Sequence, residues 1–162
     1  IINLGAEKIC LQSKFYSDRK LIKDLIDYFG GQSIVVSVDI KKNIFNKYNV
    51  WNYLSDTYNK KENLSELIYE ISKIGIGEII VTDVDREGTL KGTNKKLIKE
   101  VSKNLNIPLI FNGGTNSFDD IRESFNSGAQ AIAIGSMFVF YGKHKAVLIS
   151  YPNDEIKELI NE

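Results

Sequence analysis

The apolar residues of this chain fall into five short continuous runs, and between most of these runs apolar residues recur at helical spacing. Continuous apolar runs are typical of strands covered on both faces, as in a parallel sheet. They predict strands within residues 5–13, 33–39, 75–83, 108–111 and 128–136. The amphipathic stretches predict helices over residues 17–29, 64–74, 94–105, 118–126 and 154–160, with Ser17, Asn63 or Ser65, Thr93 and Ser117 as N-terminal caps.

Three of the predicted strands share one pattern, a glycine that ends a helix, then an apolar strand, then a polar residue. Strict alternation of strands and helices predicts an α/β fold with a parallel sheet and right-handed crossovers. The sheet is then either open and doubly wound or part of a (β/α)8 TIM barrel, which takes about 250 residues when complete. Five units in 162 residues favour a single domain, residues 1–162, that covers the last five units of such a barrel.

One predicted connection, residues 41–63, is much longer than the others and rich in aromatic residues. Loops of this length are usually lids or binding loops. A small surface hairpin that packs on its own aromatic side chains is an equally good interpretation. The aromatic residues concerned are Phe45, Tyr48, Trp51, Tyr53 and Tyr58.

Composition excludes several classes of protein. Lys and Arg number 21, as do Asp and Glu, so no general attraction to nucleic acid or to an anionic membrane is expected. No apolar run approaches the roughly 20 residues that span a bilayer. The single cysteine, Cys10, rules out an internal disulfide and fits a cytoplasmic protein. The single histidine, His144, cannot by itself form a metal cluster or a Ser-His-Asp triad. Neither a metal nor a cofactor is expected.

Side chains alternate along a strand, so the residues that face the inside of the predicted barrel can be read from the sequence. Lys8, Cys10 and Gln12 share one face of the first strand, and Glu78 and Thr82 share a face of the third. Lys8 and Glu78 would then either neutralise each other at the bottom of the barrel or turn outward to solvent. We expect Cys10 to be a buried core thiol.

Asp39 ends the second predicted strand, at the rim where barrel enzymes keep their active sites. A carboxylate at this position is suited to general acid or base catalysis. The alternative is that Asp39 caps the following loop or pairs with Lys41 or Lys42.

Glycines follow the last two predicted strands, in Gly113–Gly114 and in Gly135–Ser136. Glycine permits close approach to the backbone, and exposed N–H groups there bind phosphate without a basic side chain. Loops after the seventh and eighth strands are the usual phosphate site of a TIM barrel. Gly88, in the charged loop after the third strand, could supply another N–H group.

Several motifs together resemble the family of the cyclase subunit of imidazole glycerol phosphate synthase (HisF). They lie in the order of the last five units of that family's barrel, at residues 5–8, 37–39, 75–79, 82–89, 107–114 and 133–138. The chain starts without Met and enters a strand pattern at once, so we expect it to be the C-terminal portion of a longer protein.

The resemblance implies an enzyme that takes ammonia from a HisH-type glutaminase partner. It would convert a phosphoribulosyl-formimino aminoimidazole carboxamide ribonucleotide, which has a phosphate at each end, into imidazole glycerol phosphate and the aminoimidazole carboxamide ribotide. Asp39 matches the second of the family's two catalytic aspartates, whereas the first belongs to a strand outside this chain. Thr82 matches a threonine that contacts the substrate, and Lys8 and Glu78 match part of a charged gate for ammonia.

The same resemblance places one phosphate site at Gly88, Gly114, Gly135 and Ser136 and the other near Gln12 and Ser13. The sequence departs from the family at Glu87, which stands for an aspartate, at Gln12, which stands for an asparagine, and at Thr93–Asn94, which stands for Tyr–Asp. Residues 138–152 are more similar to a paralogous branch associated with surface-glycan loci and with acetamidino groups on sugars. A related isomerase, which needs no ammonia gate, and a non-catalytic half-barrel scaffold are further alternatives.

Overall fold

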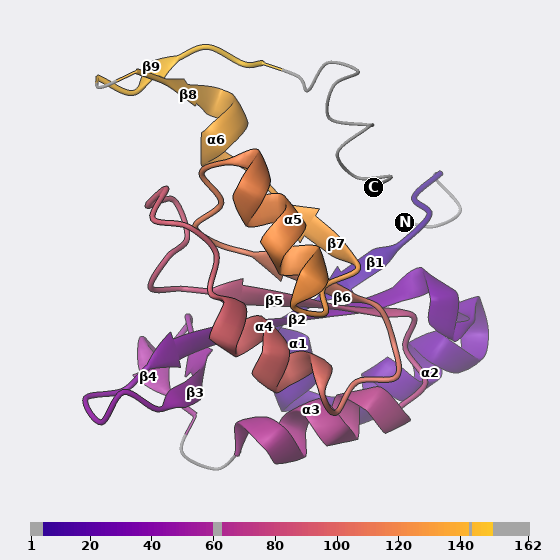
Figure 1. The fold of residues 1–162 in the computed structure, drawn as a ribbon. Helices are drawn as coiled ribbons and strands as arrows, with labels where there is room; N and C mark the ends of the chain where they lie inside the picture. The colour runs from indigo at the N-terminus through magenta and orange to yellow at the C-terminus, as the bar shows by residue number, and fades with distance from the viewer. Residues whose placement is uncertain (1–4, 60–62, 143, 151–162) are drawn as a thin grey trace.

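The computed structural model describes residues 5–59, 63–142 and 144–150. Five parallel strands form its centre, in the places that the apolar runs predict (Figure 1). They are β1 (Ile9–Leu11), β2 (Ile34–Lys42), β5 (Glu78–Asp83), β6 (Leu109–Asn112) and β7 (Ala131–Ala133). Four shorter strands are β3 (Tyr48–Asn52), β4 (Thr57–Tyr58), β8 (Phe140–Tyr141) and β9 (Ala146–Val147).

Helices separate the parallel strands, as the alternating pattern predicts. The helices are α1 (Ser13–Ser17), α2 (Arg19–Phe29), α3 (Leu64–Lys73), α4 (Lys95–Ser102), α5 (Phe118–Asn126) and α6 (Ser136–Val139), with a short 3-10 turn at Gly31–Ser33. The helix predicted over residues 154–160 lies outside the described residues. None of the helices that the structure describes is long and apolar enough to cross a membrane.

The parallel strands lie in the order β1-β2-β5-β6-β7, so each strand pairs with the next parallel strand of the chain. This sequential order is the order of a TIM barrel, whereas a doubly wound sheet reverses direction at a switch point. The α/β fold class, a partial (β/α)8 barrel, is therefore confirmed. Within the described residues, β1 and β7 are the two edges of the parallel part.

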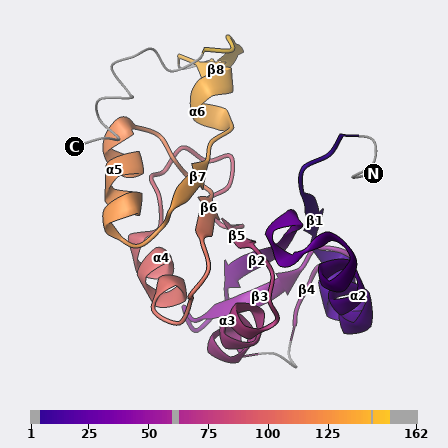
Figure 2. The same cartoon turned by 90° about the vertical axis from the view of Figure 1, so that its right-hand side faces the viewer.

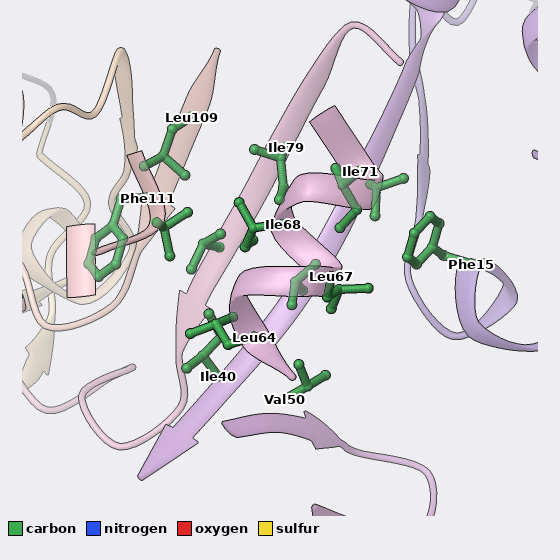
Figure 3. Packing of buried hydrophobic residues seen from close by; sticks show 14 of the residues in the cluster. Phe15, Ile40, Val50, Leu64, Leu67, Ile68, Ile71, Ile79, Leu109 and Phe111 are labelled. Atoms are coloured by element: carbon green, nitrogen blue, oxygen red, sulfur yellow. The ribbon is translucent and has the colours of Figure 1, made fainter. Parts of the chain in front are cut away.

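The two faces of this sheet differ in burial. On β5, Ile79 and Val81 are fully buried against the helices, whereas Glu78, Ile80 and Thr82 on the other face are half-buried. Figure 2 shows the helices along the outer face of the curved sheet. Figure 3 shows the core between this face and α3. The inner face, which carries the predicted column of polar side chains, is thus the open one.

The long connection after β2 forms a hairpin rather than an irregular loop. Its strands β3 and β4 pair with each other, and β3 pairs with the end of β2, at residues 40–42. The rings of Trp51 and Tyr58 pack edge to face, with centroids 5.0 Å apart. The hairpin interpretation is confirmed, and because β3 extends the ladder, β2 continues three residues past Asp39 instead of ending there.

Two of the predicted helix starts are wrong by one residue. Asp18 rather than Ser17 caps α2, where its carboxylate accepts from the backbone N–H of Leu21. Asn94 rather than Thr93 caps α4. The residues before Asp18 form a short separate helix, α1. The amphipathic pattern did not reveal the break between α1 and α2. The predicted caps Asn63 of α3 and Ser117 of α5 are confirmed.

Candidate functional site

A small pocket lies at the rim where the loops after β5, β6 and β7 meet, at the carboxyl ends of the strands. The four glycines and the serine predicted to bind phosphate there all line it. The lining comprises Glu87, Gly88, Leu90, Asn112, Gly113, Gly114, Thr115, Ala133, Ile134, Gly135 and Ser136. We call this the glycine pocket. Three loops distant in the sequence thus present their backbone to one small volume, as an anion site requires.

Glycine is required in the loop after β6 by conformation and by space. Gly113 has φ +121° and Gly114 has φ +87°, values that other residues rarely adopt. A Cβ atom on Gly113 would lie 2.8 Å from the carbonyl oxygen of Asp83, and one on Gly114 would overlap the carbonyl oxygen of Gly92. At the same place the N–H of Gly92 donates a hydrogen bond of 2.8 Å to the carbonyl oxygen of Gly114. This bond joins the loop after β5 to the loop after β6.

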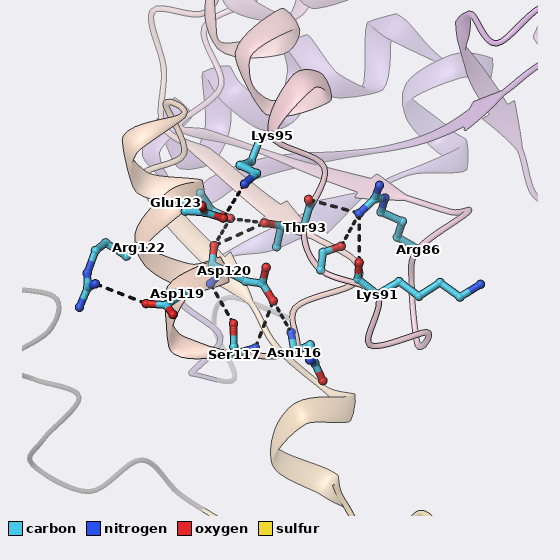
Figure 4. A network of polar contacts seen from close by, with 12 residues as sticks. Arg86, Lys91, Thr93, Lys95, Asn116, Ser117, Asp119, Asp120, Arg122 and Glu123 are labelled. Carbon is cyan, nitrogen blue, oxygen red and sulfur yellow. Dashed lines mark hydrogen bonds and ion pairs between the residues drawn. The ribbon is translucent and has the colours of Figure 1, made fainter. Parts of the chain in front are cut away.

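Charged side chains hold the loops after β5 and β6 in place through hydrogen bonds to their backbone (Figure 4). Arg86 folds back over its own loop and donates to three consecutive backbone carbonyls, those of Lys91, Gly92 and Thr93. Asp120 accepts from the N–H groups of residues 116 and 117 and completes a capping box at the start of α5. The backbone that lines the glycine pocket is therefore held in place before any ligand binds.

A second, wider pocket adjoins the first over the inner face of the sheet. Its lining comprises Gln12, Asp39, Tyr53, Thr82, Val84, Glu87 and Asn112. Glu87 and Asn112 belong to both pockets. The two predicted components, a phosphate cradle and a catalytic carboxyl, are thus parts of one continuous site.

Asp39 is the central ionisable group of this wider pocket. Its side chain is buried, and Nε2 of Gln12 donates to its Oδ2 over 2.6 Å. Burial raises the pKa of the Asp39 carboxyl above its ordinary value, the Gln12 hydrogen bond opposes this rise, and the negative charge of Glu87 adds to it.

The alternative roles considered for Asp39 do not match its contacts. Lys41 lies over the ring of Trp51, with its Nζ 4.0 Å from the centroid, and Lys42 lies near the ring of Tyr48. Neither lysine forms an ion pair with Asp39 among the described contacts. Asp39 instead faces the pocket, with an amide as its hydrogen-bond donor.

Lys8 and Glu78 form an ion pair and a hydrogen bond between β5 and the residue just before β1. Glu78 is the first residue of β5, four positions before Thr82, so the pair lies at the opposite end of the inner face from the rim. The predicted pairing of the two charges is confirmed. Whether they gate ammonia stays a prediction.

The prediction that Cys10 is a core thiol is wrong. Cys10 is exposed rather than a core thiol, because it lies on the inner face of an edge strand and little of the described chain covers that face. Burial of the sulfur is still sufficient to raise its pKa. Ser13 is the first residue of α1 and lines neither rim pocket, whereas Gln12 lines the wider one. The second phosphate site near Gln12 and Ser13 stays a prediction.

The sequence predicts no metal site. Among the residues that the structure describes, no group of three His, Cys, Asp or Glu side chains is arranged to bind a metal ion. His144 is exposed, in the turn between β8 and β9. The polar groups that line the two rim pockets are backbone, amide, hydroxyl and carboxyl groups.

Comparison with known proteins agrees with this geometry. A family model described as "Histidine biosynthesis protein" matches residues 1–145. The chain belongs to this family.

Individual members of the family are similar over nearly the whole chain. The "Putative imidazole glycerol phosphate synthase subunit HisF" of Leptospira borgpetersenii is 37% identical over 99% of this chain and 63% of its own length. The "Putative imidazole glycerol phosphate synthase subunit hisF2" of Pseudomonas aeruginosa is 36% identical over 94% of this chain and 61% of its own. The "Imidazole glycerol phosphate synthase subunit HisF" of Chloroherpeton thalassium is 31% identical over 86% of this chain and 55% of its own. The chain thus spans about three fifths of the length of these HisF relatives.

Three residues of the candidate site were not found by sequence reasoning. Asn112 ends β6 and its amide lies 3.4 Å from the Thr82 hydroxyl. Tyr53 comes from the tip of the hairpin and Thr115 from the loop after β6. The position of Asn112 at a strand end was a usable signal, as it was for Asp39. The interpretation of residues 41–63 as a binding loop was the only signal for Tyr53, and it did not single Tyr53 out from the other aromatic residues.

Proposed function

We propose that this chain is part of a HisF-type synthase subunit, a cytoplasmic enzyme that binds a phosphorylated small molecule at the rim and adds ammonia to it. The observation that carries the proposal is the continuity of the glycine pocket with the pocket around Asp39, through Glu87 and Asn112. A substrate phosphate in the first pocket would place the reacting part of the molecule beside the carboxyl in the second. The names of the HisF relatives support the same class of reaction.

The leading candidate for the reaction is the one named for the relatives' synthase, in which the phosphoribulosyl-formimino aminoimidazole carboxamide ribonucleotide and ammonia give imidazole glycerol phosphate and the aminoimidazole carboxamide ribotide. Backbone N–H groups around Gly114 and Ser136 would bind one of the substrate's phosphates. Asp39 would move protons at the reacting end as general base or acid, with Gln12 orienting its carboxyl. Thr82 and Asn112, which lie close to each other, would contact the same part of the substrate.

Ammonia would reach this site from the opposite end of the inner face, supplied by a glutaminase subunit of the HisH type. The Lys8–Glu78 pair lies at that end, half-exposed, where it can open toward a partner. A charge pair is a suitable gate because each member compensates the other while it is closed.

Substituting Glu78 by Ala tests the gate. We expect the variant to lose most of its glutamine-dependent activity in the complex with the glutaminase and to keep its activity with ammonium salt, because the route and not the rim chemistry is altered. The measurement is the ratio of the two rates, which should fall by about tenfold or more, the scale of one lost charge-assisted contact. Lys20→Ala, which removes a lysine from the exposed Lys20–Asp24 pair on α2, is the matched control. Equal losses with both nitrogen sources would contradict the channel.

A second function is favoured by Glu87. This carboxylate lines both pockets, and its negative charge already raises the pKa of Asp39. A longer acid than the family's aspartate at the mouth of a phosphate pocket fits a substrate other than the ribotide. We therefore keep a paralogous role, ammonia supply for an acetamidino group on a sugar in surface-glycan biosynthesis, as the alternative.

Turnover decides between these functions. Full-length protein with ammonium salt and the ribonucleotide should release imidazole glycerol phosphate. The change in absorbance of the substrate measures this reaction. No turnover, together with normal binding of the glutaminase and an intact fold, would favour the sugar pathway. No turnover and no effect of Asp39→Asn on any ammonia-dependent product would leave the half-barrel scaffold.

A further inference from the structure

We propose that the hydroxyl of Thr115 is a further ligand of the phosphate bound in the glycine pocket. This inference rests on the proposed function, of which it specifies one binding contact. Thr115 directly follows Gly113–Gly114 and lines the pocket together with Gly88 and Ser136.

The Thr115 hydroxyl is buried without a partner. The residue is 5% exposed, and among the described residues its Oγ1 makes no hydrogen bond. Two hydroxyls near it are paired. Thr89 Oγ1 donates to the backbone oxygen of Arg86 over 2.7 Å, and Ser124 Oγ donates to Thr93 Oγ1 over 2.9 Å. A buried hydroxyl without an acceptor is unfavourable, so its presence here calls for a ligand that supplies one.

The backbone beside Thr115 offers further unused donors. Within the described residues, the N–H groups of Gly114 and Thr115 donate to no other group, whereas the N–H of the next residue, Asn116, is taken by Asp120. Two N–H groups and one hydroxyl at consecutive residues are three donors with no acceptor. A phosphate monoester carries three acceptor oxygens on one centre, which matches this set better than a carboxylate or a neutral hydroxyl.

The lining of the glycine pocket limits what else could bind. It contains no lysine or arginine, so recognition depends on hydrogen-bond donors. Ser136 supplies a second hydroxyl across the pocket, from the loop after β7. Thr115 lines the pocket, but its hydroxyl is buried in the free protein, so the proposed contact requires a change of χ1 rotamer when the ligand binds.

The test compares Thr115→Val, which has the same shape without the hydroxyl, with Thr115→Ser, which keeps the hydroxyl. Inorganic phosphate is titrated into the full-length protein by calorimetry, and the melting temperature is measured without phosphate. We expect Thr115→Val to weaken phosphate binding about tenfold and Thr115→Ser to change it by less than about twofold. Without phosphate, Thr115→Val should melt at the same or a higher temperature, because it removes an unpaired buried polar group.

Each other result has a distinct meaning. Equal phosphate affinity in Thr115→Val and the wild-type protein would overturn the Thr115 contact and leave the proposed function intact. A lower melting temperature with unchanged affinity would overturn it as well, by giving the hydroxyl a structural partner. A wild-type protein that binds no phosphate would overturn both the contact and the phosphate site. Failure of the ribonucleotide to turn over, with the valine and serine variants still differing in phosphate affinity, would refute only the reaction.

Discussion

Replacing Asp39 by Asn is expected to lower kcat for ammonia-dependent turnover by about 10²- to 10⁴-fold, the usual contribution of a general acid or base. The amide has the shape of the carboxyl, and its oxygen can still accept from Nε2 of Gln12, which lies 2.6 Å from Asp39 Oδ2. The variant should therefore fold and bind phosphate as the wild-type protein does. The measurement is kcat and the phosphate dissociation constant on the same full-length preparation.

Asp83 offers the matched control for Asp39. It is also buried, at 2% exposure, and burial likewise raises the pKa of its carboxyl, but it lies on the helix-facing side of β5 and binds the capping residue Asn94. Asp83→Asn should cost stability, about 1–3 kcal/mol for a disturbed buried hydrogen-bond network, and leave the rate of the folded fraction nearly unchanged. Rates that fell equally in the two variants would mean that Asp39 acts through structure rather than by proton transfer.

The contacts of Asp39 also predict how activity changes with pH. The Gln12 amide donates to the charged carboxylate, which favours that form, so we expect Asp39 to act as a base. Activity should then fall as the pH falls through the pKa of Asp39, because protonation removes the base. Since burial and Glu87 raise this pKa, the fall should begin at a higher pH than for an ordinary aspartate, and Glu87→Gln should shift it to lower pH. A profile that Glu87→Gln does not move would contradict the electrostatic coupling.

Much of the site followed from the sequence because its residues lie on regular elements. The carboxyl ends of parallel strands meet at one rim, so the identity of a strand was enough to bring Gly113–Gly114 and Gly135 to one pocket. The period of two along a strand likewise placed Lys8 and Glu78 on a common face, where the structure pairs them.

What the sequence could not supply depends on tertiary contacts. Alternation along β1 correctly put Cys10 on the inner face, but its exposure depends on how much of that face is covered. The extension of β2 beyond Asp39 exists only because β3 pairs with it, and that pairing also brings Tyr53 over the site. The unpaired hydroxyl of Thr115 is a property of its surroundings, and no local pattern distinguishes it from a paired one.

Gly135→Ala is expected to weaken phosphate binding by about 10- to 100-fold while leaving the fold intact. Gly135 has an ordinary φ of −109°, and a Cβ atom added there meets no protein atom within 4 Å. The methyl group would therefore occupy open space at the glycine pocket, where a bound phosphate must approach the backbone. Overpacking of one methyl group against a ligand costs about 1–3 kcal/mol, a range that includes the expected change in affinity. Calorimetric titration with inorganic phosphate measures it.

Gly114→Ala gives the opposite combination and so controls for general damage. Its φ of +87° and the overlap of a Cβ atom with the Gly92 carbonyl should lower stability by several kcal/mol, on the order of the costs of a left-handed conformation and of overpacking together. Gly135→Ala, at the N-cap of α6, should lower stability by at most about 1 kcal/mol, because alanine caps a helix less well than glycine. Gly135→Ala should therefore affect mainly phosphate affinity and Gly114→Ala mainly stability, so the pair separates a backbone shaped for its ligand from a backbone shaped by its neighbours. Unchanged phosphate affinity in a well-folded Gly135→Ala protein would place the phosphate elsewhere on the rim.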